Sequence, residues 1–480
     1  MYISAPSPSK TKLFAIMSTN RRKFIQQLGG SAALLTASSL SSLAAKERHE
    51  TRILQAEKRI SANDKIRIAT IGMGIMGNND TNTALKVPGV ELVAVCDLYN
   101  GRLERAKELH GQNIYTTRHY EEILDRKDVD AVIIATSDNW HSKIAMEAMH
   151  KGKAVYSEKP MVHKIEQGWD VINTQKQTKA VMQIGSQHMS SIVSAKAKEQ
   201  FEQGAIGQIN SVEAFFDRQD ALGAWEYTLP LDSSPETVDW QRYQALEKNK
   251  LPYDEKKFFW WRNYRECGTG VAGDLFVHLL TQLHYITSAK GPSKIFSLGG
   301  LTYWKDGRNV PDVMNAILEY PETPQHSAFQ VSLRVNFVSG TGGGGSVKLV
   351  GTEGVMEAGG DTLSIQRHKM TKAPGYGGWD SLTTYPEAMQ KKIIDEYNKK
   401  WSQADQTREK LPDITYQAPD GYDEHLQHFT NFFDGVRMGK TIVEDPVFAF
   451  RAAAPCLLCN ESYFQNKVMV WDAENMKLVS

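Results

Sequence analysis

Residues 156–160 read Tyr-Ser-Glu-Lys-Pro, so an acid and a base directly follow an apolar stretch of strand-forming residues. Open parallel sheets bind their ligands at the carboxyl ends of the strands. If this stretch is a strand of such a sheet, Glu158 and Lys159 lie where a ligand would bind. A solvated turn is the alternative interpretation of an isolated Glu-Lys-Pro tripeptide, so other parts of the chain must decide.

A second pair with possible chemistry is Asp274 and His278, near the start of a helix predicted over residues 273–287. Side chains four residues apart lie on one face of a helix. Histidine, with an unperturbed pKa near 6.5, is well suited to take a proton from an alcohol hydroxyl. An isolated Asp/His pair is more often an ordinary helix-face contact, so its meaning depends on its partners. No third ligand at a useful spacing is evident, and we predict no metal site.

A glycine-rich turn, Gly72-Met-Gly74-Ile-Met-Gly77, follows the first apolar strand and precedes a helix-compatible stretch. Asp97 ends the next strand, at the place of a carboxylate that binds the adenosine ribose. A glycine turn made for packing alone is the alternative, but the combination predicts a dinucleotide site. Asp97 would repel a 2′-phosphate and so favours NAD over NADP, while the nearby Arg102 leaves NADP open.

Strands and helices alternate from residue 64 to about residue 187, which predicts an α/β domain with a Rossmann-type, doubly wound parallel sheet. Residues 188–480 contain longer strand candidates separated by turns. They predict an α+β domain with a large, mainly antiparallel open sheet and C-terminal helices, for substrate binding and oligomerisation. Within it, residues 368–419 are charged and aromatic, and we expect an irregular surface excursion.

The N-terminal region has the layout of a twin-arginine signal peptide: Arg21 and Arg22, then Phe24 and a weakly apolar Ala/Ser/Leu stretch ending in small residues. We predict a signal peptide over residues 1–45, with Met17 as a possible true start, and a linker over 46–63. The protein would then meet the twin-arginine export machinery and reside in the periplasm. A disordered basic tail is the alternative.

The composition argues against several classes of protein. Lysine plus arginine equals aspartate plus glutamate, 56 each, which argues against a nucleic-acid partner. No apolar run is long enough to predict a membrane span. The four cysteines suggest no disulfide framework, and Cys456 and Cys459 lie in an apolar helical run that predicts core packing.

Four motifs occur in a fixed order: GMGIMG, ATSDNWH, SEKP and GTGVAGDLFVH. Together they resemble the glucose–fructose oxidoreductase/inositol dehydrogenase (Gfo/Idh/MocA) family. The stretch FFWWRNYRECGTG is similar to a subgroup of exported bacterial members. The resemblance implies that Lys159 is the active-site lysine at the nicotinamide and that Asp274 and His278 complete the site. Our hypothesis makes His278 the base, Asp274 an orienting group and Lys159 the cation beside the developing alkoxide, with Lys159 as base still open.

The remaining site predictions follow from the same motifs. For the cofactor they are Gly72, Gly74, Met76, Gly77, Asp97, Thr136, Asn139, His141, Glu158, Lys159 and Gln187. For the substrate they are Trp261, Arg262 and Tyr264, with Trp140 as a further candidate and core packing as the alternative for the tryptophans. We assign no role to His163, His188 or His284.

The resemblance implies an NAD(P)-dependent oxidoreductase that acts on a secondary hydroxyl or ketone of a sugar or glycoside, with tightly held cofactor. An alternative is a redox-neutral NAD-dependent glycoside hydrolase. Such an enzyme oxidises the sugar, eliminates the aglycone, adds water and reduces the ketone again. The known subgroup of that kind lacks the lysine of the Glu-Lys-Pro motif. A third possibility is a sugar-binding protein without activity. We expect a homo-oligomer, because the open sheet in such folds often packs against a second copy.

Overall fold

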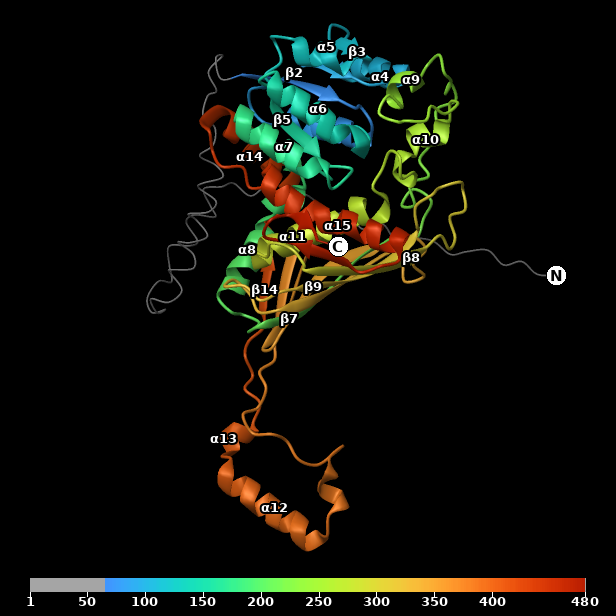
Figure 1. The fold of residues 1–480 in the computed structure, drawn as a ribbon. Coiled ribbons are helices and arrows are strands. Elements are labelled where there is room, and N and C mark those ends of the chain that lie inside the picture. The colour runs from blue at the N-terminus through green and yellow to red at the C-terminus, as the bar shows by residue number, and fades with distance from the viewer. Residues whose placement is uncertain (1–64, 480) are drawn as a thin grey trace, which may run out of the picture. The chain divides into compact units, whose positions relative to one another are not determined.

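A computed structural model describes residues 65–479 of the chain. The predicted signal peptide and the whole of the predicted linker lie outside these residues, so both remain predictions. The described residues contain two β-sheets with helices packed on them (Figure 1).

The first sheet is parallel throughout and confirms the doubly wound prediction. Its six strands are β1 (Ile66–Ile71), β2 (Val90–Cys96), β3 (Tyr115–Thr117), β4 (Ala131–Ile134), β5 (Ala154–Glu158) and β6 (Met182–Gly185), in the order β3-β2-β1-β4-β5-β6. The connecting helices are α3 (Ile75–Ala84), α4 (Asn100–His110), α5 (Tyr120–Asp125), α6 (Asp138–His150) and α7 (Gln167–Thr178). We did not predict β3, which has only three residues and no apolar run.

The order of these strands fixes where a ligand can bind. The chain winds outward from β1 to β3, then returns to start β4 on the other side of β1. The loops after β1 and β4 therefore leave in opposite directions, and a crevice opens between them at the carboxyl ends of the strands. All four residues of β4 are buried, as expected for a strand covered on both faces.

The second sheet has ten strands and is antiparallel except for the parallel pair β7 and β10. It consists of β7 (Ile209–Asp217), β8 (Lys294–Gly300), β9 (Val313–Tyr320), β10 (Phe329–Asn336), β11 (Gly344–Gly351), β12 (Gly354–Gly359), β13 (Thr362–Arg367), β14 (Ile414–Gln417), β15 (Met469–Asp472) and β16 (Lys477–Leu478). The prediction of a large, mainly antiparallel sheet is confirmed.

Among residues 65–479, helices cover only one face of the second sheet. Buried and exposed residues alternate along β9 and β10, which is the pattern of a strand with one face in the core. Helices α8 (Ile192–Glu202), α11 (Val277–Thr287) and α15 (Pro446–Gln465) pack on the buried face (Figure 1). The other face exposes apolar side chains, among them Leu298 and Ile317.

The surface excursion is more ordered than the sequence suggested. Between β13 and β14 lie η5 (Ser381–Thr384), α12 (Glu387–Lys400) and α13 (Gln403–Gln406), so an irregular segment is the wrong description. No residue of α12 is buried. The helix has an acid in its first turn and two lysines in its last, which favour its dipole, but it lacks the buried apolar face that makes a helix recognisable.

The first sheet is completed by a helix from the far end of the chain. Phe429, Phe432 and Phe433 of α14 (Glu424–Met438) pack in one cluster with Ile68 and Tyr156 of the parallel strands. The ring of Tyr156 stacks on Phe429 with centroids 4.2 Å apart. A boundary near residue 187 therefore separates the strands of the two sheets but not the helices that cover them (Figure 1).

We expect Phe432→Ala to lower the free energy of unfolding by about 3–5 kcal/mol, because Phe432 is fully buried between α14 and the parallel sheet. Met389→Ala, on the exposed helix α12, should change it by less than about 0.5 kcal/mol. Urea denaturation followed by circular dichroism measures both. Equal, small effects would contradict the packing of α14 described above.

Candidate functional site

One cavity of about 410 Å³ begins at the carboxyl ends of β1 and β4 and is lined by residues of both sheets' domains. It brings together residues of the glycine turn after β1, Glu158 and Lys159 at the end of β5, and residues of the segment 272–278. Residues 272–276 form a π-helical turn that leads into α11. The crevice expected from the strand order is therefore the site that these motifs share.

The three glycines of the turn have different reasons to be glycine. Gly72 has a positive φ of +94°, and a Cβ there would lie 2.5 Å from the carbonyl oxygen of Ala135. A Cβ on Gly77 would overlap the carbonyl oxygen of Gly72, so Gly77 allows α3 to start close to β1. A Cβ on Gly74 would meet nothing closer than 3.8 Å. Folding does not require glycine at 74, which instead keeps space open at the N-terminus of α3, where a pyrophosphate would bind.

Asp97 is buried at the end of β2, and its carboxylate is held by the backbone. Its Oδ2 accepts from the Met73 amide at 2.7 Å and its Oδ1 from the Tyr99 amide at 2.9 Å. Arg102 Nη1 lies 3.5 Å from Oδ2. An acid fixed in this way can still accept from a ribose hydroxyl, but the arginine beside it adds a positive charge.

An aromatic segment from the second half of the chain packs against this end of the cavity. Tyr99 pairs with Val238 through an isolated β-bridge, and the Arg102 guanidinium lies over the rings of Phe258 and Phe259, 5.9 and 5.4 Å from their centroids. We call residues 229–267 the strap, which includes α9 (Trp240–Tyr243), α10 (Glu255–Phe259) and η3 (Trp261–Asn263). The strap encloses the glycine end of the cavity.

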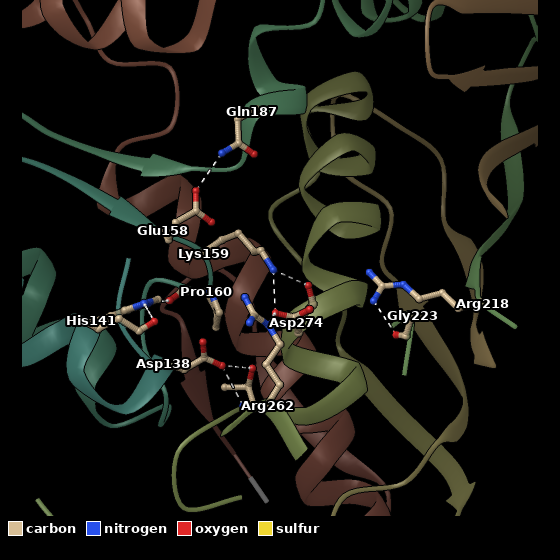
Figure 2. Close-up of polar contacts among 12 residues, drawn as sticks. Asp138, His141, Glu158, Lys159, Pro160, Gln187, Arg218, Gly223, Arg262 and Asp274 are labelled. Atoms are coloured by element: carbon tan, nitrogen blue, oxygen red, sulfur yellow. Dashed lines mark hydrogen bonds and ion pairs between the residues drawn. The ribbon is translucent and has the colours of Figure 1, made fainter. Parts of the chain in front are cut away.

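Lys159, Asp274 and Arg262 form one buried ionic group (Figure 2). Lys159 Nζ donates to Asp274 Oδ1 and to the Asp274 carbonyl oxygen, both at 2.9 Å, and Arg262 Nε donates to the same Oδ1 at 3.0 Å. The side chains of Lys159 and Asp274 are only 9% and 5% exposed. The predicted meeting of the Glu-Lys-Pro lysine with Asp274 is therefore present in the structure.

The local structure around Asp274 differs from the predicted α-helix. Residues 272–276 make a π-helical turn, a geometry found most often at functional sites. A Cβ on Gly273 would overlap the Thr269 side chain, which shows how tightly this turn is wound. Asp274 and His278 both line the cavity nevertheless, so the expectation that they face the same space is met by a different backbone.

The charges of this group act strongly on one another. Burial alone would raise the pKa of Asp274, but the positive charges of Lys159 and Arg262 outweigh it and hold the pKa well below its usual range. Burial would lower the pKa of Arg262, but Asp274 outweighs it and the pKa is raised. Asp274 is therefore a carboxylate, shared by two cations.

His278 is partly buried at the same cavity wall, and its Nδ1, which is shielded from solvent, has no hydrogen-bond partner among the described residues. Burial, followed by the charges of Lys159 and His188, lowers its pKa well below 6.5. The His278 imidazole is accordingly neutral near pH 7, with a nitrogen available to accept a proton.

His188, to which the sequence assigned no role, lies beside His278. The two rings are 5.8 Å apart, and His188 Nδ1 lies 2.7 Å from Glu424 Oε1 of α14. Burial would lower the pKa of His188, but the hydrogen bond and charge of Glu424 outweigh it and raise the pKa. Two neighbouring histidines thus have opposite tendencies, with His278 neutral and His188 favouring the protonated form.

Glu158 points away from the ionic group into the first domain. Its Oε1 accepts from Gln187 Nε2 at 2.9 Å, a contact between two of the cofactor candidates that the sequence did not predict (Figure 2). Burial raises the pKa of Glu158 to about 7. Burial and then the charge of Glu158 raise the pKa of the buried Asp80 as well. Each of these two buried carboxyl groups therefore favours its protonated form more than a free carboxyl group does.

Most of the other predicted residues also line the cavity: Met76, Thr136, His141, Trp140, Trp261 and Arg262. Two do not. Asn139 lies in the first turn of α6, where its Oδ1 accepts from the Ser137 hydroxyl and its backbone N–H donates to the Cys267 carbonyl. Tyr264 is buried, and its carbonyl closes the turn to Gly268 while Lys257 lies over its ring. Both serve local structure, so neither contacts the cavity in this structure.

Several lining residues were not predicted from sequence: Arg118, His188, Phe216, Arg218, Tyr227, Arg242, Phe258, Phe259 and His425. Most come from the strap or from positions just after β6 and β7. No short motif marks them, and only the fold brings them to the cavity. Among the described residues, no group of three or more His, Cys, Asp or Glu side chains is arranged to hold a metal ion, and no helix is long and apolar enough to cross a membrane.

Comparisons with known proteins agree with this geometry. Residues 66–186 match the family described as "Oxidoreductase family, NAD-binding Rossmann fold", GFO_IDH_MocA. A glycosyl hydrolase family 109 protein of Shewanella baltica is 33% identical over 175 residues, which cover 33% of this chain and 37% of that protein. The chain thus spans little more than a third of the length of the curated relatives it matches.

Solved structures show the same fold over most of the chain. The WlbA dehydrogenase of Bordetella pertussis, in complex with NADH and UDP-GlcNAcA, has a TM-score of 0.59 at 16% identity, covering 85% of this chain and 99% of that one. The aldose–aldose oxidoreductase of Caulobacter crescentus, complexed with glycerol, has a TM-score of 0.59 at 15% identity, covering 85% and 99%. The glycine turn, Asp97 and the open N-terminus of α3 fit a dinucleotide.

We expect Gly74→Ala to weaken dinucleotide binding by at least about tenfold without lowering the thermal stability of the apoprotein, because its Cβ enters space that only a ligand would fill. Gly72→Ala, at φ +94°, should instead destabilise the apoprotein by about 1–3 kcal/mol. Thermal denaturation and NAD titration of the cofactor-free protein measure both. Full NAD affinity in Gly74→Ala would contradict this placement of the pyrophosphate.

Proposed function

Because residues 66–186 belong to the Gfo/Idh/MocA oxidoreductase family, we propose that the protein is an NAD-dependent dehydrogenase that interconverts a secondary hydroxyl and a ketone on a sugar or glycoside. One observation carries the proposal: Lys159 and Asp274, 2.9 Å apart, share a cavity with the unpartnered His278 and with the glycine turn. Proton acceptor, cation and dinucleotide cradle thus surround a single space.

The proposed reaction moves one hydride and one proton. Bound NAD would supply the hydride acceptor, held by the glycine turn and Asp97. As the carbinol carbon loses its hydride, His278 takes the hydroxyl proton and a carbonyl remains. The Lys159 ammonium stabilises the negative charge that develops on the oxygen. Asp274, which binds both Lys159 and Arg262, holds these cations in place.

The hydrogen bonds of Lys159 to Asp274 favour His278, and not Lys159, as the base. Its ammonium donates to two oxygens of one residue, the carbonyl and the carboxylate of Asp274, which suits a protonated donor. His278 has the opposite surroundings, since burial and neighbouring positive charge favour its neutral form. We therefore assign the proton acceptor to His278.

NAD rather than NADP is the proposed cofactor, because the Asp97 carboxylate would lie beside a 2′-phosphate. Arg102, 3.5 Å from that carboxylate, offsets part of the repulsion, so the preference is one of degree. The strap supports tight retention of the cofactor, since Phe258 and Phe259 and the bridge at Val238 close over that end of the cavity.

Export and assembly complete the proposal. The twin-arginine pattern at Arg21 and Arg22 supports export of a folded, cofactor-loaded protein to the periplasm, although these residues lie outside the described ones. The uncovered face of the second sheet, with Leu298 and Ile317 exposed, supports pairing with a second copy. Tight retention would suit a compartment without a pool of free NAD.

A redox-neutral glycoside hydrolase is the second candidate, favoured by the name of the Shewanella baltica relative and its 33% identity. That route also begins with hydride removal, so the same three residues would serve its first step. The dehydrogenase remains first because Lys159, absent from the known hydrolase subgroup, is here the partner of Asp274.

The test is mass spectrometry of products after incubation of the full chain, with its cofactor as purified, with alkyl and aryl glycosides. A product lighter by two hydrogens with an intact glycosidic bond is expected. Released aglycone with unoxidised sugar would instead establish the hydrolase. Lys159→Met should bind NAD normally but reduce hydride transfer by at least about 10²–10³-fold; undiminished turnover would refute the role of Lys159.

The pH dependence of kcat/KM tests the role of His278. The base must be neutral, and its lowered pKa means that activity should fall only as the pH drops below 6.5. His278→Gln should reduce kcat/KM by about 10²–10⁴-fold and remove this acidic limb. An acidic limb that persists unchanged in His278→Gln would assign the proton to another group.

A further inference from the structure

Arg218 differs from the other two cations near the reacting centre. Lys159 and Arg262 both bind the Asp274 carboxylate. Arg218, directly after β7, also lines the cavity, but it forms no ion pair within 4.0 Å with any carboxylate of residues 65–479. Among residues 65–479, the guanidinium of Arg218 donates one hydrogen bond, from Nη1 to the carbonyl oxygen of Gly223 at 2.8 Å.

The guanidinium of Arg218 is held close to the catalytic group. It lies over the rings of Phe216 and Phe337, 5.4 and 5.5 Å from their centroids. Its charge contributes to the lowered pKa of both Asp274 and His278. Figure 2 shows the side chain extending from its strand toward Asp274, with the dashed contact to Gly223 on one nitrogen. Most of its N–H groups are left for a ligand.

The loop that carries this contact is rigidly supported. Trp225 is buried with φ +66°, unusual for a non-glycine residue, and its ring meets Phe337 edge to face with centroids 4.8 Å apart. Arg308 donates to the carbonyl of Ala224 at 2.9 Å and pairs with Asp306. Backbone strain of this kind persists only where the surroundings fix it, so Arg218 faces a preformed wall.

The nearby acids are engaged elsewhere. Asp220 Oδ1 accepts from the Gly223 amide at 2.6 Å, and Asp138 Oδ2 accepts from the amide and hydroxyl of Thr269. Glu158 binds Gln187, and Glu424 binds His188. Asp274 is already shared by two cations. Although Asp138 Oδ1 has no partner, no carboxylate of residues 65–479 lies within 4.0 Å of an Arg218 nitrogen, so the guanidinium has no anionic partner among these residues.

We propose that Arg218 binds an anionic substituent of the substrate, a carboxylate or a sulfate ester, and that the protein acts on acidic sugars. This inference rests on the proposed function only in taking the ligand to be a sugar. The planar guanidinium fork is suited to bidentate binding of such oxyanions. A neutral sugar would leave this charge partly desolvated without a partner. Since Arg218 lines the same cavity as Asp274 and His278, the anion lies on the ring that carries the reacting hydroxyl or on the ring next to it.

Isothermal titration calorimetry of the full chain, with its cofactor as purified, tests the proposal. The probes are methyl β-D-glucopyranosiduronate, methyl 6-O-sulfo-β-D-glucopyranoside and methyl β-D-glucopyranoside. At least one acidic probe should bind about tenfold or more tightly than the neutral glucoside. The probe that is preferred distinguishes carboxylate from sulfate.

Variants assign the selectivity to Arg218. Arg218→Gln should remove the preference for the acidic probe while leaving the affinity for the neutral glucoside within about twofold. Arg218→Lys, which keeps the charge but loses the fork, should retain part of the preference. Arg105→Gln is the matched control. It removes the same charge at a position on α4 where the side chain is 61% exposed, away from the cavity. Thermal denaturation confirms that each variant is folded.

The outcomes separate this inference from the proposed function. Selective binding of an acidic probe, lost in Arg218→Gln, supports the inference even if no probe is oxidised. Turnover of the neutral glucoside with equal affinity for all three probes supports the dehydrogenase and overturns the inference. Failure of both acidic probes to bind, or selectivity that survives in Arg218→Gln, also overturns it.

Discussion

The site depends on one buried carboxylate. Asp274 accepts from Lys159 at the end of β5 and from Arg262 in the strap, so a single oxygen joins the first domain to two segments of the second. Removing charged groups from water is costly, and a buried ion left without its partner costs several kcal/mol. Each segment therefore stabilises the placement of the others, and the geometry of the cavity is set by electrostatics as well as by packing.

This constraint also explains how two neighbouring histidines differ. His278 lies on the cationic side and is kept neutral by burial and by Lys159, whereas His188 is bound to Glu424 and tends to be charged. A proton acceptor needs a neutral ring, and a charged ring beside it would attract an oxyanion. The same cavity thus holds a base and a field of positive charge without a metal ligand set among the described residues.

Features set by neighbouring residues could be predicted from the sequence, and features set by distant contacts could not. The glycine turn, the alternating strands and the lysine after β5 follow from local chemistry, and all lie where expected. Arg218, Tyr227 and Phe258 are ordinary residues until the fold brings them to the cavity. The π-helical turn at Asp274 departs from the regular spacing that a helix prediction assumes, and α12 has no buried face to reveal it. Asn139 and Tyr264 occupy the right motifs, but neither lines the cavity, and their hydrogen bonds are local: Asn139 Oδ1 accepts from Ser137, and the Tyr264 carbonyl accepts from the Gly268 amide.

The return of α14 to the parallel sheet has a consequence for how the chain is made. Strands β1 to β6 leave the ribosome long before Phe429, Phe432 and Phe433, which cover them, have been synthesised. Until then one apolar side of the nucleotide-binding half is open to water, and Glu424, the partner of His188, is missing. The nucleotide-binding half therefore cannot bury this part of its core until α14 has been synthesised. A chain truncated before residue 424 would expose this apolar surface, and we expect it to aggregate rather than fold as a smaller domain.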